Sequence, residues 1–143
     1  MLALLTAGFG LGLLVSAGLP GIDRLLAPER SPPPESTPDS SWSAVQHALD
    51  QATYAEARGL LLPLAEAGQA RAQRHLARLH RDGQGGVRSH AQAYYWFQRA
   101  AEQGDARAQQ ALAGLYAHGY GVDRDLARAA FWSTRARLQD DSR

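Results

Sequence analysis

The sequence AEAGQARAQ at residues 65–73 returns as AEQGDARAQ at residues 101–109, a shift of 36 residues. Self-similarity at a fixed period is the signature of a repeat architecture, so this pair of segments decides the fold class. The shift needs no gap, and two full copies and a leading half copy can be traced. It also superposes Leu76 on Leu112, Leu79 on Leu115, His80 on Tyr116, Gly83 on Gly119, Gly85 on Gly121, Ala93 on Ala129, Trp96 on Trp132 and Ala100 on Ala136.

The spacing of apolar residues within each copy is helical. In the middle copy the apolar positions 93, 96, 97 and 100 are three or four residues apart, which places them on one face of a helix. Small alanines between large aromatic residues let two helix backbones approach closely. We therefore expect Trp96 and Trp132 to fill the layer between neighbouring helix hairpins.

Glycine and proline mark the ends and irregularities of the predicted helices. Gly68 and Gly104 stand where a left-handed C-terminal cap needs a residue without a β-carbon, and Asp105 can cap the helix that follows. Pro63 lies inside a predicted helix, where its missing amide and its ring predict a kink. Each unit is thus a helix hairpin, and the predicted helices cover residues 42–50, 53–67, 70–82, 90–103, 106–118 and 124–138.

The last copy carries a pattern that resembles the Sel1-like repeat family over about residues 54–138. Each copy departs from the pattern at one position. Arg137 replaces the second alanine in the last copy, His80 replaces a tyrosine in the middle copy, and Leu60 replaces a tryptophan in the leading half copy. The residues that match are Leu112-Ala113-Gly114-Leu115-Tyr116, Gly119-Tyr120-Gly121-Val122, Asp125, Arg128-Ala129, Phe131-Trp132 and Ala136.

The resemblance implies both a fold and a kind of function. The fold is an all-α, short right-handed helical-hairpin solenoid of about 2.5 repeats, similar to tetratricopeptide repeats. From the composition of the N-terminus we expect an apolar helix to precede it. The family serves mainly as adaptors in signalling and envelope processes, so the resemblance implies a protein-binding module.

The N-terminus has the composition of a membrane segment. No residue from Met1 to Ile22 is charged, and about 20 apolar residues suffice to cross the hydrocarbon core of a bilayer. We interpret residues 1–22 as a transmembrane anchor or, alternatively, as a signal segment cleaved after Ala17. In an anchor, Gly8, Gly12 and Ser16 would form a stripe of small residues that permits a homodimer.

Residues 23–41 form a proline-rich linker in this interpretation, and residues 42–143 the repeat domain. Pro28 to Ser41 contains five prolines among polar residues, so we expect an extended spacer of about 40 Å at ~3.1 Å per residue. Arg24 and Arg30 favour a cytoplasmic orientation by the positive-inside rule. Exported members of the family instead favour the inner membrane or periplasm, and the side of the membrane stays open.

The chemistry that an enzyme needs is missing from the sequence. There is no nucleophile elbow, zinc-protease motif or P-loop, and the chain has no cysteine. His75 and His80 are five residues apart and cannot chelate one ion from the same helix face. The net charge of +1 argues against a nucleic-acid binder. We predict no catalytic residue, no metal site and no cofactor.

One predicted binding surface is a ridge of aromatic and arginine residues. Because Trp96 faces the core, Tyr95 and Arg99 point away from it at a spacing that lets them touch. Phe131 and Arg135 repeat this pair one copy later. Aromatic residues and arginine are typical hot spots for binding a peptide, although the rings could instead pack on the neighbouring hairpin.

The second predicted surface is a row of arginines on the helix at residues 70–82. These side chains fall within an arc of about 80° at ~100° per residue. The row suits an acidic partner or anionic lipid headgroups, or it is an ordinary solvated face. It consists of Arg71, Arg74, Arg78 and Arg81, and its counterparts one repeat later are Arg107, Gln110, Gly114 and Ala117.

The sequence thus predicts an adaptor or scaffold for an unidentified protein or peptide partner, tethered to the bacterial inner membrane or exported across it. A structural envelope component that self-associates through its anchor is the alternative. An enzyme is the third hypothesis and has no sequence support.

Overall fold

The computed structural model describes residues 38–142, which form α-helices and no strand. The predicted anchor, most of the linker and the small-residue stripe lie outside these residues. The helices are α2 (Pro38–Asp50), α3 (Tyr54–Glu66), α4 (Ala70–Asp82), α5 (His90–Glu102), α6 (Ala106–His118) and α7 (Leu126–Asp140).

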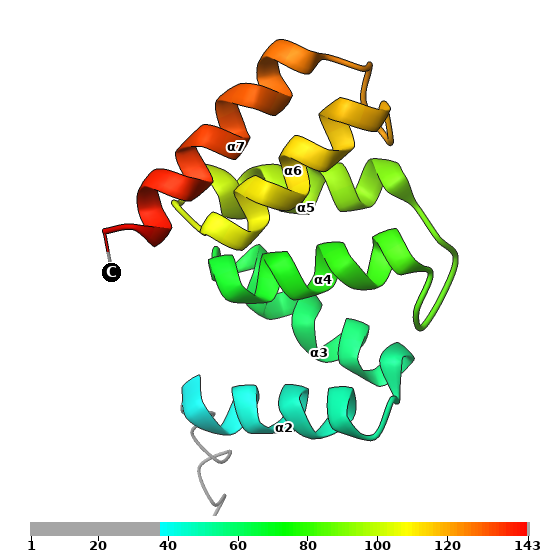
Figure 1. Ribbon diagram of the computed structural model, residues 1–143. Helices are drawn as coiled ribbons and strands as arrows, with labels where there is room; N and C mark the ends of the chain where they lie inside the picture. The colour runs from blue at the N-terminus through cyan, green and yellow to red at the C-terminus, as the bar shows by residue number, and fades with distance from the viewer. Residues whose placement is uncertain (1–37, 143) are drawn as a thin grey trace, which may run out of the picture. The chain divides into compact units, whose positions relative to one another are not determined.

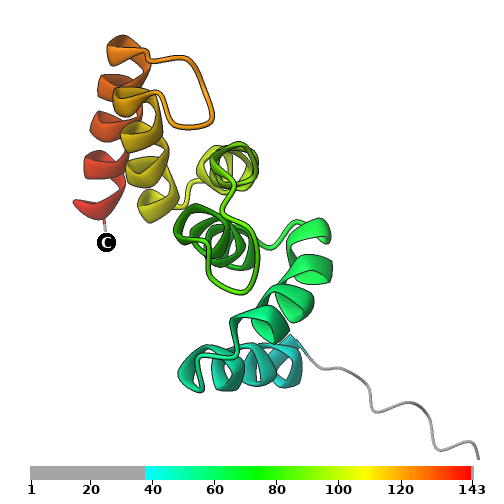
Figure 2. The same cartoon turned by 90° about the vertical axis from the view of Figure 1, so that its right-hand side faces the viewer.

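Consecutive helices pack against each other and follow one another as a stack (Figure 1). Figure 2 views α4 and α5 nearly end-on, between α3 and α6. Short turns at residues 67–69 and 103–105 join α3 to α4 and α5 to α6, whereas loops at 83–89 and 119–125 join α4 to α5 and α6 to α7. The described part is therefore a short helical solenoid, as the repeat predicts.

Helices α2 and α7 depart most from the predicted ranges, whereas the ends of α3 and α5 lie within one residue of the predicted ones. Helix α2 begins at Pro38, inside the predicted linker of residues 23–41, because proline is well tolerated in the first helical turn and Asp39 there complements the helix dipole. Helix α7 runs two residues later than predicted because Asp125 is its N-cap and accepts a hydrogen bond from the amide of Arg128. Helix α3 continues through Pro63 to Glu66.

The core lies between successive helices and consists of alanines interleaved with a few large side chains. Phe97 is 1% exposed and Trp96 is 6% exposed, so both fill the interior of the stack. Trp132, the counterpart of Trp96, is only partly buried. Its helix, α7, is the last one described, and no described helix follows to cover it.

Two glutamines are the buried polar residues of the described chain. Gln73 in α4 donates its side-chain amide to the carbonyl of Ala65 in the last turn of α3, at 3.0 Å. Gln109 in α6 donates in the same way to the carbonyl of Ala101 in α5, also at 3.0 Å. The glutamine amide gives a second hydrogen bond to that carbonyl, which also accepts from the backbone amide of Gly68 or Gly104 at 3.0 Å. It thereby fixes where the next helix crosses.

The loop after α4 touches the start of α3 through a glycine, and the loop after α6 touches the start of α5 in the same way. A β-carbon on Gly85 would lie 2.4 Å from the carbonyl of Tyr54, and one on Gly121 would lie 2.2 Å from the carbonyl oxygen of His90. Both glycines have positive φ. Arg58 strengthens the first contact by donating its Nε to the carbonyl of Gln84 at 2.6 Å. The Gly-x-Gly spacing of the repeat is thus a packing requirement.

This contact predicts that Gly121→Ala destabilises the fold by about 1–3 kcal/mol, because the new methyl group meets backbone at a positive φ. Gly114→Ala is the matched control. Gly114 lies inside α6, where an added β-carbon meets nothing within 4 Å, so this change should stabilise by about 0.5–1 kcal/mol. Urea unfolding of both variants measures the difference, and equal midpoints would contradict the proposed loop contact.

Candidate partner-binding surfaces

The predicted arginine row lies on one side of α4, but its members have different surroundings. The guanidinium carbon of Arg71 lies 3.7 Å from the ring centroid of Trp42 in α2. Such a cation–π contact joins alternate helices of the stack. This role of Trp42 was not predicted from the sequence, because α2 belongs to the part of the chain where the repeat pattern is weakest.

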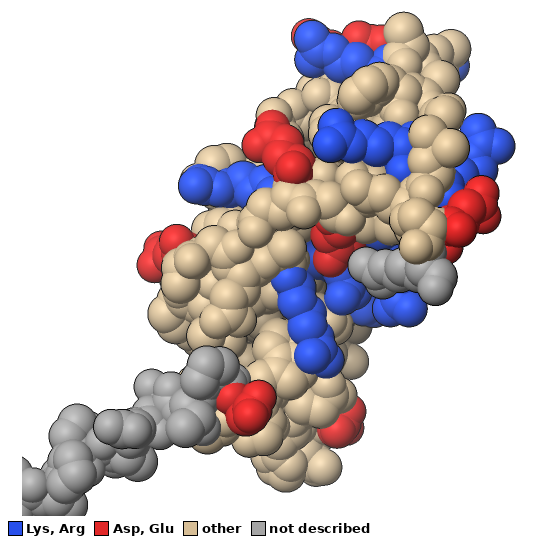
Figure 3. Space-filling view, turned by 90° about the vertical axis from the view of Figure 1, so that its left-hand side faces the viewer, with Lys and Arg blue, Asp and Glu red and all other residues tan. Residues whose placement is uncertain are grey.

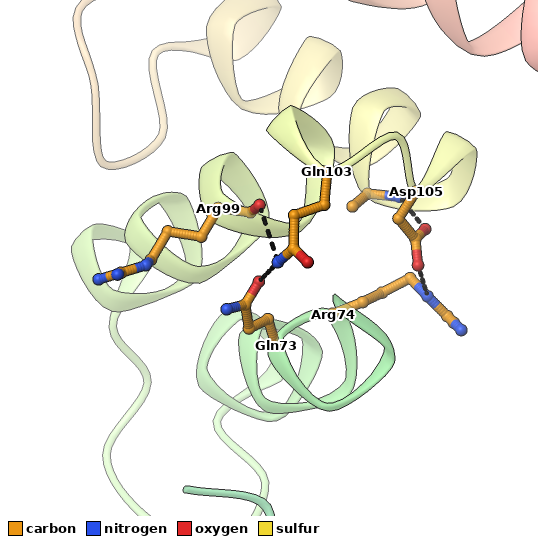
Figure 4. Close-up of polar contacts among 6 residues, drawn as sticks. Gln73, Arg74, Arg99, Gln103 and Asp105 are labelled. Carbon is orange, nitrogen blue, oxygen red and sulfur yellow. Dashed lines mark hydrogen bonds and ion pairs between the residues drawn. The ribbon is translucent and has the colours of Figure 1, made fainter. Parts of the chain in front are cut away.

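Arg74 forms an ion pair with Asp105, the N-cap of α6, with 2.9 Å between Nε and Oδ2 (Figure 4). Asp105 also accepts a hydrogen bond from the amide of Ala108 at 2.9 Å, so it caps α6 and holds Arg74 together. The two charged side chains are only 13% and 16% exposed. Figure 4 also shows Gln103 donating to the side-chain oxygen of Gln73 at 2.8 Å, which links the α5–α6 turn to α4.

The other two arginines of the row are less constrained. Arg81 pairs with the adjacent Asp82 at 2.8 Å, and both side chains are more than a third exposed. Arg78 is exposed and forms no ion pair with any described residue. Arg107 on α6, the counterpart of Arg71, is likewise exposed and forms no ion pair with any described residue.

These side chains border a concave site between α4 and α6, which we call the arginine cleft. Its volume is about 200 Å³. No carboxylate lines it, and its apolar members are a buried ring of α5 and an alanine of α6. The lining residues are Arg74, Arg78, Arg81, Phe97, Arg107 and Ala111.

Figure 3 shows several arginines grouped near the middle of one face of the molecule. Two further hollows flank the cleft along α4. A hollow of about 420 Å³ shares Arg74 and Arg107 with the cleft and adds Asp105 and Asp140. Another, of about 280 Å³, lies between α2 and α4. It is lined by Gln46, Leu49, Tyr54, His75, Arg78, Leu79 and Gln84.

His75 reports the positive potential of this side of α4. Its pKa is lowered from 6.5 to about 4, first by burial and then by the nearby charges of Arg74, Arg78 and Arg71. The ring of Trp42 packs edge-on against His75 with 5.5 Å between centroids. His75 is therefore neutral at pH 7. From the sequence, His75 was considered only as a metal ligand together with His80, and these contacts were not predicted.

The predicted aromatic ridge is exposed on α5 and α7. Tyr95 is 45% exposed, and Arg99 donates a hydrogen bond to its hydroxyl. Phe131 is 56% exposed, and its ring packs edge-on against Trp132, over which Arg135 lies at 5.6 Å. Tyr95 packs in the same way on Trp96 of its own helix. Each ring therefore rests on its own helix and leaves a large area open.

Phe131 and Arg135 also border an apolar hollow of about 490 Å³ on the outer side of α7. The remaining lining residues are Ala127, Ala130, Thr134 and Leu138. The two halves of the predicted ridge thus share an aromatic–arginine pair, and Phe131 and Arg135 additionally line this hollow.

The histidines do not form a metal site in the described part of the chain, where no group of three histidine or acidic side chains is positioned to hold an ion. Tyr120 instead stacks on His90 at 4.8 Å and on His118 at 5.3 Å between centroids. This stack packs the loop after α6 onto the start of α5. Sequence reasoning assigned no contact to these histidines.

These features define the class of protein: a helical-repeat solenoid with a concave, arginine-lined site and exposed aromatic side chains. The Sel1 repeat family matches residues 70–105 and 106–141, which together make up half of the chain. The chain belongs to the Sel1 repeat family. The two matched repeats are α4 with α5 and α6 with α7, in the register predicted from the shift of 36 residues.

Two solved structures share this fold. A Sel1 repeat protein from Oxalobacter formigenes is 34% identical, with a TM-score of 0.59 over 60% of this chain and 25% of its own. A protective antigen present in uropathogenic Escherichia coli strains, displaying an SLR fold, is 28% identical, with a TM-score of 0.66 over 73% of this chain and 24% of its own. The chain thus spans about a quarter of either protein. A search of curated proteins found no match.

None of the helices α2 to α7 is both long and apolar enough to cross a membrane. Proteins of the Sel1 repeat family mediate protein–protein interactions in general, and the family fold is generally a non-enzymatic scaffold.

The pKa of His75 predicts a specific loss of stability in acid. In the unfolded chain His75 takes up a proton near pH 6.5, whereas the folded chain resists protonation until about pH 4. Protonation therefore favours the unfolded state, and His75 should lower the free energy of unfolding as pH falls from 6.5 to 4. His75→Gln lacks this titration. Urea unfolding at several pH values should give a steeper decline for the parent, and parallel declines would show that His75 is not shielded.

Proposed function

We propose that this protein is an adaptor that binds a protein or peptide partner on the surface of its repeat domain. Membership of the Sel1 repeat family supports the general function. The observation that carries the proposal for this chain is the aromatic–arginine pair that stays exposed at equivalent positions of two repeats, Tyr95 with Arg99 and Phe131 with Arg135.

The physical reason is that a large exposed ring buries a wide apolar area on binding and loses little side-chain entropy. Tyrosine and phenylalanine bring a wide contact area with few rotatable bonds, and an adjacent arginine supplies directed hydrogen bonds. The hollow beside Phe131 offers a place for an apolar side chain of the partner. Two such pairs one repeat apart would engage two points of the same partner.

The second part of the proposal concerns location. The uncharged run of residues 1–22 supports tethering to the bacterial inner membrane or export across it. A structural envelope component that pairs through Gly8, Gly12 and Ser16 is the alternative. The N-terminal sequence of the mature protein separates the two, because a chain that begins at Gly18 has lost the segment that would pair.

The adaptor proposal predicts that the variant Tyr95→Ala/Arg99→Ala/Phe131→Ala/Arg135→Ala stays helical by circular dichroism but loses the partner that the full chain captures. Removal of true hot spots should cost about 2 kcal/mol or more of binding free energy.

The matched control is Val87→Ala/Arg88→Ala. It also removes an apolar side chain and an arginine from exposed positions, Val87 being 86% exposed, and should capture the partner like the parent. Titration of the purified partner by calorimetry quantifies both variants. Equal affinity of the quadruple variant and the parent would remove the ridge from the proposal.

A further inference from the structure

We propose that the arginine cleft between α4 and α6 binds an acidic segment of the protein partner, a carboxylate-bearing peptide rather than a lipid or a nucleic acid. This inference rests on the proposed adaptor function and names the chemistry of a second contact, separate from the aromatic ridge. Four arginines from two repeats and no carboxylate line the cleft.

The first argument is the balance of charge inside the chain. Asp105 neutralises Arg74 and Asp82 neutralises Arg81, at 2.9 and 2.8 Å. Arg78 and Arg107 form no ion pair with any described residue. Two guanidinium groups thus remain available on opposite walls of one concave site, and each can hold a carboxylate by two parallel hydrogen bonds.

The second argument is that the repeat fold does not require an arginine at position 78 of α4. The repeat shift carries Arg74, Arg78 and Arg81 to Gln110, Gly114 and Ala117 on α6, a helix of the same length in the same packing. The core residues of α4 and α6 agree under the same shift. A charge row that one repeat carries and the next omits, while the helix keeps its length, is a surface feature of this repeat.

The third argument concerns the floor of the cleft. Phe97 is 1% exposed and forms an apolar base, and the guanidinium of Arg81 lies 5.8 Å from its ring centroid. Attraction between opposite charges is stronger beside such a base than in open water. Burial lowers the pKa of His75 most, and the charges of Arg74 and Arg78 lower it further, which agrees with the arginines that gather along this helix.

The shape and size of the cleft favour a peptide over other anions. A volume of about 200 Å³ accommodates one or two side chains, whereas a bilayer surface is flat and cannot enter a concave site between two helices. A nucleic acid would need many phosphate contacts, and the net charge of the chain is only +1. An extended segment with a carboxylate facing each wall matches the two unpaired arginines.

The test uses the full chain and a short fluorescein-labelled peptide of alternating glutamate and leucine, read by fluorescence anisotropy. Arg78→Gln/Arg107→Gln should weaken binding by about tenfold or more, because hydrogen bonds to charged groups are lost on both walls. Arg88→Gln/Arg124→Gln removes the same charge from two exposed loop positions outside the cleft and should bind like the parent. Equal affinity of the two double variants would overturn the proposal.

Measurements on the parent chain keep the test valid if the cleft variant loses helicity. Affinity for the peptide should fall as salt rises, and the same peptide with glutamine for glutamate should not bind. Binding of the glutamine peptide, or no effect of salt, would refute an acidic ligand. Phosphatidylglycerol vesicles or single-stranded DNA that bind more tightly than the peptide, in a way that depends on Arg78 and Arg107, would reassign the cleft.

The outcome for the cleft can be separated from that for the adaptor function. If the cleft variant still captures the full protein partner with parental affinity while the ridge variant does not, the adaptor function stands and the acidic-segment inference fails. If both variants keep the partner but the cleft variant loses the peptide, the cleft binds acidic peptides and the partner uses another surface.

Discussion

The buried amide of one glutamine per repeat is the constraint on which the rest of the stack depends. Gln73 and Gln109 are each at most 2% exposed, and each donates to a carbonyl near the end of the preceding helix. A buried side-chain amide without a partner costs about 1–3 kcal/mol, so the glutamine has to lie where that carbonyl can accept its hydrogen bond. The bond therefore fixes the position of α4 on α3 and of α6 on α5, and hence the spacing of the walls of the arginine cleft.

A second set of polar contacts connects this constraint to the arginine cleft. Gln103 donates to Gln73 from the α5–α6 turn, and two residues later Asp105 caps α6 and pairs with Arg74. The turn is thus held to α4 at two points, both partly buried, and the second lies at the rim of the cleft. Arg74 therefore has a structural task, which leaves Arg78 and Arg107 as the arginines free to meet a ligand.

The periodicity of the sequence was sufficient to predict the fold but not the contacts between repeats. A shift of 36 residues located α3 to α7 within two residues, because glycine and the aromatic core recur at fixed positions. The start of α2 was missed since proline reads as a linker in sequence although it can open a helix. The arginine row was predicted as one stripe. Its division into paired and unpaired members depends on Asp105, which lies 31 residues from Arg74 on another helix.

The comparison of α4 with α6 shows how the repeat separates stability from binding. The residues that hold the stack, a buried glutamine, a leucine and a loop glycine touching backbone, recur in both copies. The positions facing the cleft change from arginine to glutamine, glycine and alanine. Gly114 weakens an isolated helix by about 0.5–1 kcal/mol relative to alanine, yet α6 keeps the length of α4. Packing therefore sets the helix, and the exposed positions of each repeat can change with the partner while the glutamine bond keeps them in place.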